Sequence, residues 1–329
     1  MNKRNQRRSG YGLLYVLLLT TLVSGFASEA FRASRYQFFL AASHAQKLQA
    51  SSLARAGVNL ARAGLILDDN EFDDLEEDWA ILSMMSQMSP LPVGNGFVSV
   101  LIEDEEGRQN LNAMNESELL EYFKALNLKR VKQGDILDLD IVEQNIERDL
   151  VDSYLDWIDH DDVERQFGAE SIYYKRQRKS IPHNQPLATL AELLLIKGFT
   201  GDMLFGRKGN PRLYDMLTIY GPGKININTT SRAVLESIIK MEQPYSSDWI
   251  VDALMQYRPY KTDAAFQSMA ARYGLSQGIV QRFKVKSEYF RVLATGIIGS
   301  VEEIVEVIVK RSGQKCDILV WREGLKGFE

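Results

Sequence analysis

The first 67 residues carry two hydrophobic patterns in succession. Residues 11–28 have no charged side chain, and they follow a segment, residues 3–8, with four basic side chains and no acid. Because the first proline is Pro90, nothing in this stretch forces a helix to end. The pattern predicts one helix from Tyr11 to Leu67, about 85 Å long at about 1.5 Å per residue.

Beyond residue 28 this predicted helix becomes amphipathic. Apolar and small residues recur at steps of three, four or seven positions, which places them on one face. They are Phe31, Phe38, Ala42, Ala45, Leu48, Ser52, Ala56, Leu60, Ala63 and Leu67. We expect this face to pack partly on a sheet of the same chain and partly on helices of partner proteins.

Three interpretations of the N-terminus are open. A cleaved secretory signal would use the poor cleavage site around Ser28-x-Ala30. A plain membrane anchor is the second, although 18 uncharged residues are at the short end for a span. The third is a leader of the type IV prepilin kind, in which a basic segment ends at Gly10 and the apolar helix stays on the mature protein. In each case the basic residues hold the N-terminus in the cytoplasm and the rest of the chain crosses outward.

The remaining chain changes from strand to helix and back. Residues 97–103 are rich in β-forming side chains, and three further strands are predicted at 289–296, 302–310 and 316–322. Between them the pattern is mainly helical. Helices are predicted at 116–126, 136–158 (one or two), 188–196, 229–240, 248–257, 263–273 and 276–283.

The order of these elements predicts an α+β fold. Its simplest form is a small antiparallel sheet packed on the long N-terminal helix, with a large all-α domain inserted between the strands. We divide the chain into a leader (1–10), an apolar half-helix (11–28), an amphipathic helix with the first part of the sheet (29–112), the helical insert (113–286) and the remaining strands (287–329).

Composition and the absence of certain motifs argue against several classes of function. The chain has 329 residues and a formal net charge of −5, and an acidic balance argues against nonspecific binding of nucleic acid. The chain has one cysteine, Cys316, so it cannot form an internal disulfide. The apolar neighbours of Cys316 indicate that its thiol is buried. No nucleophile, zinc or phosphate-loop pattern occurs, so we expect no catalytic residues and no enzyme.

Two acidic stretches could bind an ion or a partner, or could simply be solvated. The run at 68–78 is interpreted as a solvated connector, with partner contact or ion binding as alternatives. The cluster from Asp156 to Glu164, followed by Gly168 and Glu170, brings carboxylates close enough to repel one another unless a cation or protons lie among them.

Hard oxygen ligands favour calcium over a transition metal at this second cluster. Asp159, Asp161 and Glu170 match the first, third and twelfth positions of an EF-hand loop, but Val163 and Glu164 occupy the fifth and sixth. It is therefore not an EF-hand loop. A calcium loop of another shape and a solvated helix end both stay open.

The segment from Lys224 to Leu235 resembles the start of a helix-hairpin-helix module, because a strand-like lead-in is followed by Asn228-Thr229 capping a helix. The expected glycine hairpin reads Met241-Glu-Gln-Pro-Tyr245, with no glycine and an added acid. We interpret the segment as structural rather than as a phosphate-binding nest.

Several short motifs occur together in the order typical of one family. They are Gly107-Arg108, Asn110-Leu-Asn112, Leu155-Asp-Trp-Ile-Asp159, Gly168-Ala-Glu170, Tyr173-Tyr174, Asn184-Gln-Pro-Leu187, Glu192-Leu193, Lys197-Gly198, Tyr220-Gly221 and Asn228-Thr229. With the prepilin-like leader, they make the chain resemble the general secretion pathway protein K family, the large minor pseudopilins of type II secretion. The resemblance spans nearly the whole chain.

This resemblance implies several properties. The fold would be type IV pilin-like, with an insert of the SAM or helix-hairpin-helix kind. Prepilin peptidase would cleave between Gly10 and Tyr11, and Tyr11 would be N-methylated. The partners would be the minor pseudopilins I and J (and H), the inner-membrane assembly platform, exported proteins and membrane lipid. Calcium is reported in the family's helical domain, which favours Asp159, Asp161 and Glu170 as ligands.

One departure from the general pilin pattern concerns the fifth residue after Gly10. Most pilins carry a glutamate there, which balances the N-terminal amine of a neighbour inside lipid; here the residue is Tyr15. A subunit at the tip of a pseudopilus has no neighbour ahead of it, so it would not need the acid. A minor pilin of a type IV pilus and a membrane-anchored DNA-uptake protein are the alternatives.

Overall fold

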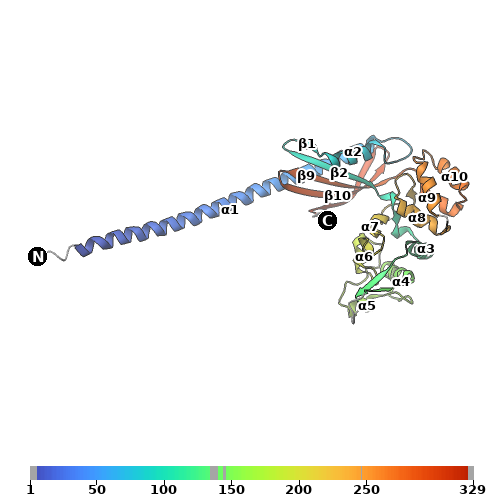
Figure 1. Cartoon of the computed structure of the whole chain (residues 1–329), viewed down its shortest axis with the longest axis horizontal. Helices are drawn as coiled ribbons and strands as arrows, with labels where there is room; N and C mark the ends of the chain where they lie inside the picture. The colour runs from blue at the N-terminus through green and yellow to red at the C-terminus, as the bar shows by residue number, and fades with distance from the viewer. Residues whose placement is uncertain (1–5, 134–139, 144–145, 246, 325–329) are drawn as a thin grey trace.

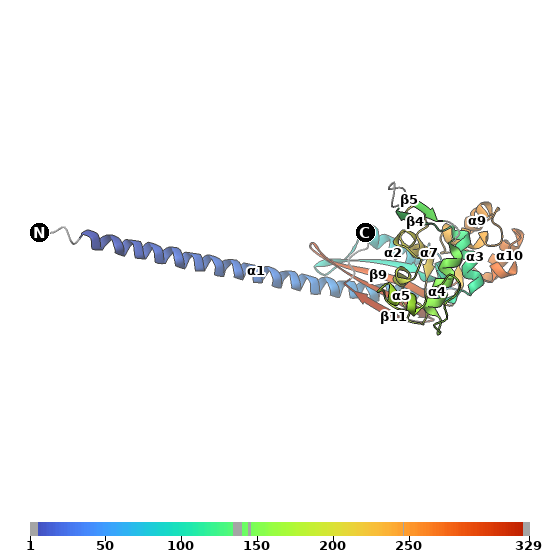
Figure 2. The same ribbon diagram turned by 90° about the horizontal axis from the view of Figure 1, so that it is seen from below.

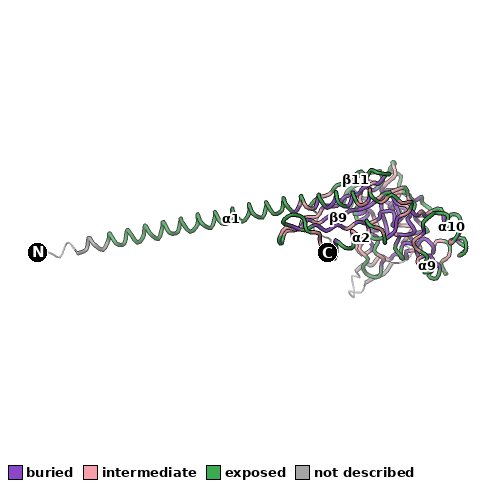
Figure 3. Tube along the Cα trace, turned by 90° about the horizontal axis from the view of Figure 1, so that it is seen from above, coloured by how far each residue is buried: buried purple, intermediate pink, exposed green. Residues whose placement is uncertain are grey.

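The computed structural model describes residues 6–133, 140–143, 146–245 and 247–324. The predicted N-terminal helix is one continuous rod, α1 (Gln6–Leu67). Every side chain from residue 11 to residue 49 is exposed, and Ala50 is the first buried one. Figures 1 and 3 show the result: α1 projects far beyond the body of the protein, and only its C-terminal end lies on the sheet.

The sheet has five antiparallel strands in the order β1-β2-β9-β10-β11. Its strands are β1 (Leu91–Val93), β2 (Gly96–Asp104), β9 (Tyr289–Ile298), β10 (Val301–Ser312) and β11 (Lys315–Glu323). The four longer strands match the four predicted from the sequence, while β1 was not predicted. A long register of paired residues joins β2 to β9, so segments nearly 200 residues apart in the chain form the centre of the sheet.

The face of α1 that packs on the sheet is not the one expected. Its buried residues are Ala50, Ala54, Gly57, Val58, Ala61 and Leu65, which lie on the apolar face of β2, β9 and β10. The predicted face is exposed, including Leu48, Leu60 and Leu67. The expectation that it packs on the protein's own sheet was therefore wrong.

Small residues explain this choice of face, because they let α1 approach the sheet closely. A Cβ added at Gly296 of β9 would lie 2.0 Å from the carbonyl oxygen of Ala50, and one at Gly57 of α1 would lie 2.7 Å from Val98 Cγ1. At Gly296 the strand lies against the backbone of α1, and at Gly57 the helix backbone lies against side chains of the sheet, so dispersion contacts accumulate along the interface. The larger leucines on the opposite face would hold helix and sheet apart.

Helix α2 (Asp78–Met88) covers one edge of the sheet. The hydroxyl of Ser86 donates to the Val100 carbonyl (2.8 Å) and accepts from the Val100 amide (3.0 Å). Ser83 Oγ accepts from the Ile102 amide (2.9 Å). These side chains replace the hydrogen bonds of a missing neighbouring strand, which protects the edge of β2 beyond β1.

The insert lies at the end of the sheet remote from the N-terminus (Figures 1 and 2). Its helices are α3 (Glu116–Leu126), α4 (Glu147–Ile158), α5 (Ser171–Arg176), α6 (Gly201–Leu204), α7 (Leu213–Met216), α8 (Arg232–Lys240), α9 (Ser247–Gln256), α10 (Asp263–Arg272) and α11 (Gln277–Val280). Trp157, Tyr122 and Tyr154 are among the fully buried side chains of its core.

The insert also contains short strands, so it is not all helical. They are β4 (Arg130–Gln133), β5 (Asp140–Glu143), β6 (Leu217–Thr218), β7 (Ile225–Asn226) and β8 (Phe283–Lys284), and β3 (Gln109–Asn110), just before the insert, pairs with β6. The hairpin of β4 and β5 includes residues 140–143, where a helix was predicted; residues 134–139 and 144–145 lie outside the described part.

Two further helix predictions need correction. Residues Leu190–Leu195 form a 3₁₀ helix rather than an α-helix, with Thr189 and Glu192 in a capping box. Helix α8 is capped by Ser231, whose hydroxyl accepts from the Val234 amide, and not by Asn228 or Thr229. The α+β class, with a long N-terminal helix packed on an antiparallel sheet and a mainly helical insert, is confirmed.

Candidate functional site

The acidic cluster of the insert forms where α4 ends and α5 begins. Asp156 lies in the last turn of α4, Asp159 is its C-cap, and Glu170 precedes the first turn of α5. One carboxylate oxygen from each of these residues lies within 4.8 Å of the others. The structure thus brings together two of the three predicted ligands, Asp159 and Glu170, and adds Asp156.

Asp161 does not join this group. Its side chain is exposed, and its Oδ1 accepts a hydrogen bond from the Val163 amide (2.9 Å), which closes a local turn. The EF-hand comparison suggested this residue because it assumed a continuous loop. The spacing of Asp156 and Asp159, three residues apart on one helix, was the signal that sequence reasoning did not use.

Glu170 is the most unusual member of the cluster. It is 3% exposed, and neither of its carboxylate oxygens has a hydrogen-bond partner among the described residues; the same holds for Asp159 Oδ1. Burial raises the pKa of Glu170 to about 7, and repulsion from Asp156 and Asp159 adds to that rise. A buried carboxylate without donors is costly unless a cation balances it.

Arg165 supplies one positive charge to the cluster. Its Nη1 donates to Asp156 Oδ1 (2.7 Å) and also to Asp159 Oδ2. The loop that carries Arg165 returns tightly on α4, because a Cβ at Gly168 would lie 1.9 Å from Asp156 Oδ2. Glycine at 168 is therefore required for this approach.

The donor set of this cluster fits calcium. Ca²⁺ takes several oxygen ligands at about 2.3–2.6 Å in flexible geometry. Three carboxylates converge here, and three of their oxygens lack hydrogen-bond donors. Asp156, Asp159 and Glu170 are the residues that would hold the ion.

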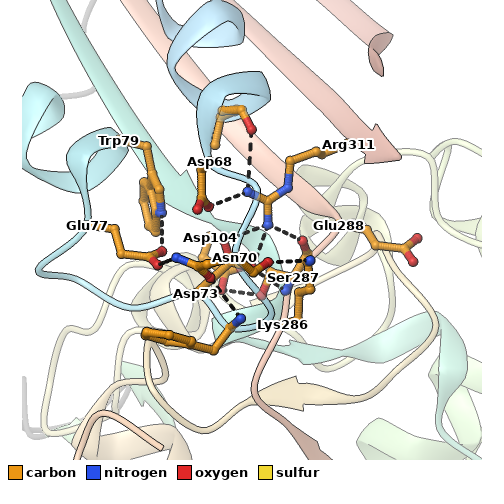
Figure 4. Close-up of polar contacts among 12 residues, drawn as sticks. Asp68, Asn70, Asp73, Glu77, Trp79, Asp104, Lys286, Ser287, Glu288 and Arg311 are labelled. Carbon is orange, nitrogen blue, oxygen red and sulfur yellow. Dashed lines mark hydrogen bonds and ion pairs between the residues drawn. The ribbon is translucent and has the colours of Figure 1, made fainter. Parts of the chain in front are cut away.

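A second acidic group, formed by Asp68, Asp73 and Glu77, lies where α1 ends (Figure 4). Here the cation is Arg311 of β10, which is 4% exposed. Its guanidinium donates to Asp68 Oδ2 (2.6 Å) and to both carboxylate oxygens of Asp73 (2.5 and 2.6 Å). Burial raises the pKa of Asp73 to about 7, and the Arg311 charge limits that rise.

This group continues into a network that joins the sheet to the insert. Asp104, at the end of β2, accepts from Ser287 Oγ (2.6 Å), Thr229 Oγ1 (2.6 Å) and Asn226 Nδ2 (3.1 Å). The Ser287 amide in turn donates to Asp73 Oδ2 (2.6 Å). The run at 68–78 is thus not merely a solvated connector, because Asp73 and Asp74 are buried.

The helix-hairpin-helix-like segment serves this same junction. Asn226 and Thr229 bind Asp104, and Asn228 exchanges hydrogen bonds with the backbone of Tyr260 (2.9 and 2.8 Å). In the turn after α8, the Glu242 carboxylate accepts from Ser276. An acid therefore stands where a phosphate nest would need free amides.

The remaining predicted site, Gly10 and Tyr11, lies in the first turns of α1. Within the described residues, α1 is the one helix long and apolar enough to cross a membrane. Tyr11 is exposed, as are the apolar side chains after it.

Cys316 is buried against α1, and its backbone carbonyl accepts from Arg62 Nε (2.9 Å).

Comparisons with known proteins find similar sequences over most of the chain. Residues 107–205 match the family model for type II secretion system protein K. A curated type II secretion system protein K of Klebsiella pneumoniae is 29% identical, with 98% of each chain covered.

A solved structure supports the same fold. The chain matches one in the crystal structure of the GspK-GspI-GspJ complex from enterotoxigenic Escherichia coli, with a TM-score of 0.66 and 20% identity. The match covers 87% of this chain and 99% of the other. Taken together, the family model over residues 107–205, the full-length relative and this structure make the chain similar to type II secretion system protein K in sequence and in fold.

Proposed function

We propose that this protein is a minor pseudopilin of a type II secretion system and occupies the tip of the pseudopilus, where it initiates assembly and supports export of folded proteins across the outer membrane. One observation carries the proposal: the insert lies beyond the sheet at the end remote from the N-terminus of α1 (Figure 1). In a filament whose subunits stack along their N-terminal helices, such an insert would occupy the space of the next subunit. A position with no subunit ahead removes this clash.

The two exposed parts of α1 have different roles in this proposal. Residues 11–28 lie in the inner membrane before assembly, with the basic N-terminus in the cytoplasm and the sheet and insert in the periplasm. The exposed face with Leu48, Leu60 and Leu67 packs on helices of partner pseudopilins. The similar chain of known structure was solved in complex with GspI and GspJ, which supports the homologous I and J proteins as partners here.

Assembly would begin with processing of the leader. Prepilin peptidase cleaves between Gly10 and Tyr11, and Tyr11 becomes N-methylated. Because α1 runs without interruption through this site, the retained helix can pass from lipid into the filament as one element. The assembly platform, the H pseudopilin and exported proteins complete the expected set of partners.

Calcium binding at Asp156, Asp159 and Glu170 belongs to the same proposal. An ion there would link the end of α4 to the start of α5 and so stabilise this part of the insert. The unpartnered oxygens of Glu170 support it, since they are already buried and need no further desolvation to receive an ion.

The leader assignment on which this proposal depends is tested by a Gly10→Val variant in cells that depend on this secretion system. We expect an uncleaved precursor, no pseudopilus and loss of secretion. Gly12→Ala is the matched control, because a Cβ at Gly12 meets no atom within 4 Å and the residue lies two positions from the cleavage site. Normal processing and secretion in the Gly10→Val strain would refute the leader assignment and, with it, the proposed pseudopilin role.

A further inference from the structure

Arg165 holds an unusual place in the acidic cluster of the insert. Its Nη1 is shared between Asp156 Oδ1 and Asp159 Oδ2, which belong to the group of carboxylates that would receive a cation. A positive side chain of the protein thus lies among the proposed calcium ligands.

One guanidinium does not neutralise the cluster. Three carboxylates converge, and Arg165 contacts two of them. Glu170 has no donor among the described residues although it is buried. Charge is therefore only partly balanced, and a divalent cation would balance it better.

The backbone around Arg165 is anchored independently of its guanidinium. The Phe167 amide donates to Asp152 Oδ2 (3.2 Å), and Lys197 Nζ donates to the carbonyl oxygens of Phe167 (3.1 Å) and Gly168 (2.6 Å). The Arg165 side chain is about one-third exposed, at 32%. It can therefore turn into solvent while the loop keeps its place.

We propose that Arg165 is a built-in competitor of calcium: its guanidinium and Ca²⁺ exclude one another from the pocket of Asp156, Asp159 and Glu170. The inference rests on the calcium site proposed above. Both cations use oxygens of Asp156 and Asp159, and two positive charges a few ångströms apart repel in a poorly solvated site. Calcium entry releases Arg165 to the surface, and removal of calcium returns it to the carboxylates.

This exchange has two consequences with opposite signs. Arg165 keeps the cluster stable when calcium is scarce, because the buried carboxylate of Asp156 and the partly buried one of Asp159 retain a charged partner. The same contact weakens calcium binding, because the ion must first displace the guanidinium. A residue that only positioned the ligands would instead strengthen calcium binding.

The experiment measures Ca²⁺ affinity and thermal unfolding of the full chain in detergent, for the wild type and three variants. Arg165→Gln removes the competitor. Arg165→Lys keeps the charge, and Arg176→Gln removes the same charge from an exposed arginine of α5. We expect Arg165→Gln to bind Ca²⁺ at least tenfold more tightly than the wild type, while the other two stay within about threefold.

In a calcium chelator Arg165→Gln should unfold at a lower temperature than the wild type, and saturating Ca²⁺ should remove that difference. Unchanged or weaker binding by Arg165→Gln, with clear binding by the wild type, would overturn the inference and leave the calcium site standing. No binding by either protein would overturn both.

Discussion

The buried guanidinium of Arg311 offers the sharpest test of how the long helix, the sheet and the insert are held together. Arg311→Met keeps much of the side chain's length and apolar volume but removes the charge. In the folded protein, Arg311 donates to Asp68, to both oxygens of Asp73 and to the Ser287 carbonyl (2.8 Å). It also lies over the Phe290 ring, 4.9 Å from the centroid. The variant loses all the hydrogen bonds that the guanidinium donates.

The expected cost follows from the burial of both partners. Arg311 is 4% exposed and Asp73 is 0% exposed, so the variant leaves a buried carboxylate without its cation. Removing one partner of such a pair costs about 3–5 kcal/mol. At about 2 °C per kcal/mol for a protein of this size, the unfolding temperature should fall by about 6–10 °C.

Thermal unfolding followed by tryptophan fluorescence and near-ultraviolet circular dichroism can measure this effect. Trp79 packs edge-on against Phe290, with ring centroids 5.4 Å apart, so it reports on the junction. Lys310→Met is the matched control. Lys310 precedes Arg311 on β10 but is 40% exposed and contacts Glu288, so its loss should cost less than about 1 kcal/mol.

Two further measurements distinguish a buried unpaired charge from a general packing defect. Adding Asp73→Asn to Arg311→Met should recover part of the lost stability, since the uncompensated carboxylate disappears. The cost of Arg311→Met should also shrink as pH falls. Without the guanidinium the pKa of Asp73 rises further above its unfolded value, so protonation at lower pH relieves the penalty. A loss under about 1 kcal/mol at neutral pH would refute the reasoning.

Three other predictions concern different parts of the fold. Gly296→Val should lower stability by more than about 2 kcal/mol in a chemical denaturation series, because its Cβ would press on the Ala50 carbonyl oxygen; unchanged stability would contradict the close approach. Ser86→Ala should cost about 1–3 kcal/mol in the same assay, since the Val100 amide and carbonyl lose their partner, and Ser86→Thr, which keeps the hydroxyl, should cost less. Glu170→Gln should reduce calcium binding at least tenfold in a Ca²⁺ titration, and equal affinity would remove Glu170 from the ligand set.

The outline of the fold follows from local patterns in the sequence. An uncharged run after a basic leader predicts α1, and runs of β-forming residues predict β2, β9 and β10. These signals are strong because they are carried by many successive residues. Local patterns do not show which face of α1 packs on the sheet. The face of α1 that packs on the sheet is rich in alanine and includes Gly57, whereas Leu48, Leu60 and Leu67 stay outside, since a close approach of helix and sheet outweighs the size of individual side chains.

The candidate site was predictable only in part for a related reason. Asp159 and Glu170 stand out in the sequence, but Asp161 looks equally suitable until the turn at Val163 directs it to solvent. The acidic run at 68–78 has the same composition as a solvated connector. Its burial depends on Arg311, more than 200 residues later, which no local pattern connects to it.

We infer that the apolar N-terminal helix stays on the mature protein as its membrane anchor and filament core. Mass spectrometry of the mature N-terminus in cells with an active secretion system tests it most directly. We expect a mature chain that begins at Tyr11 and carries one methyl group on its amine. A mature chain that begins near Glu29 or Ala30, with that helix removed, would contradict it.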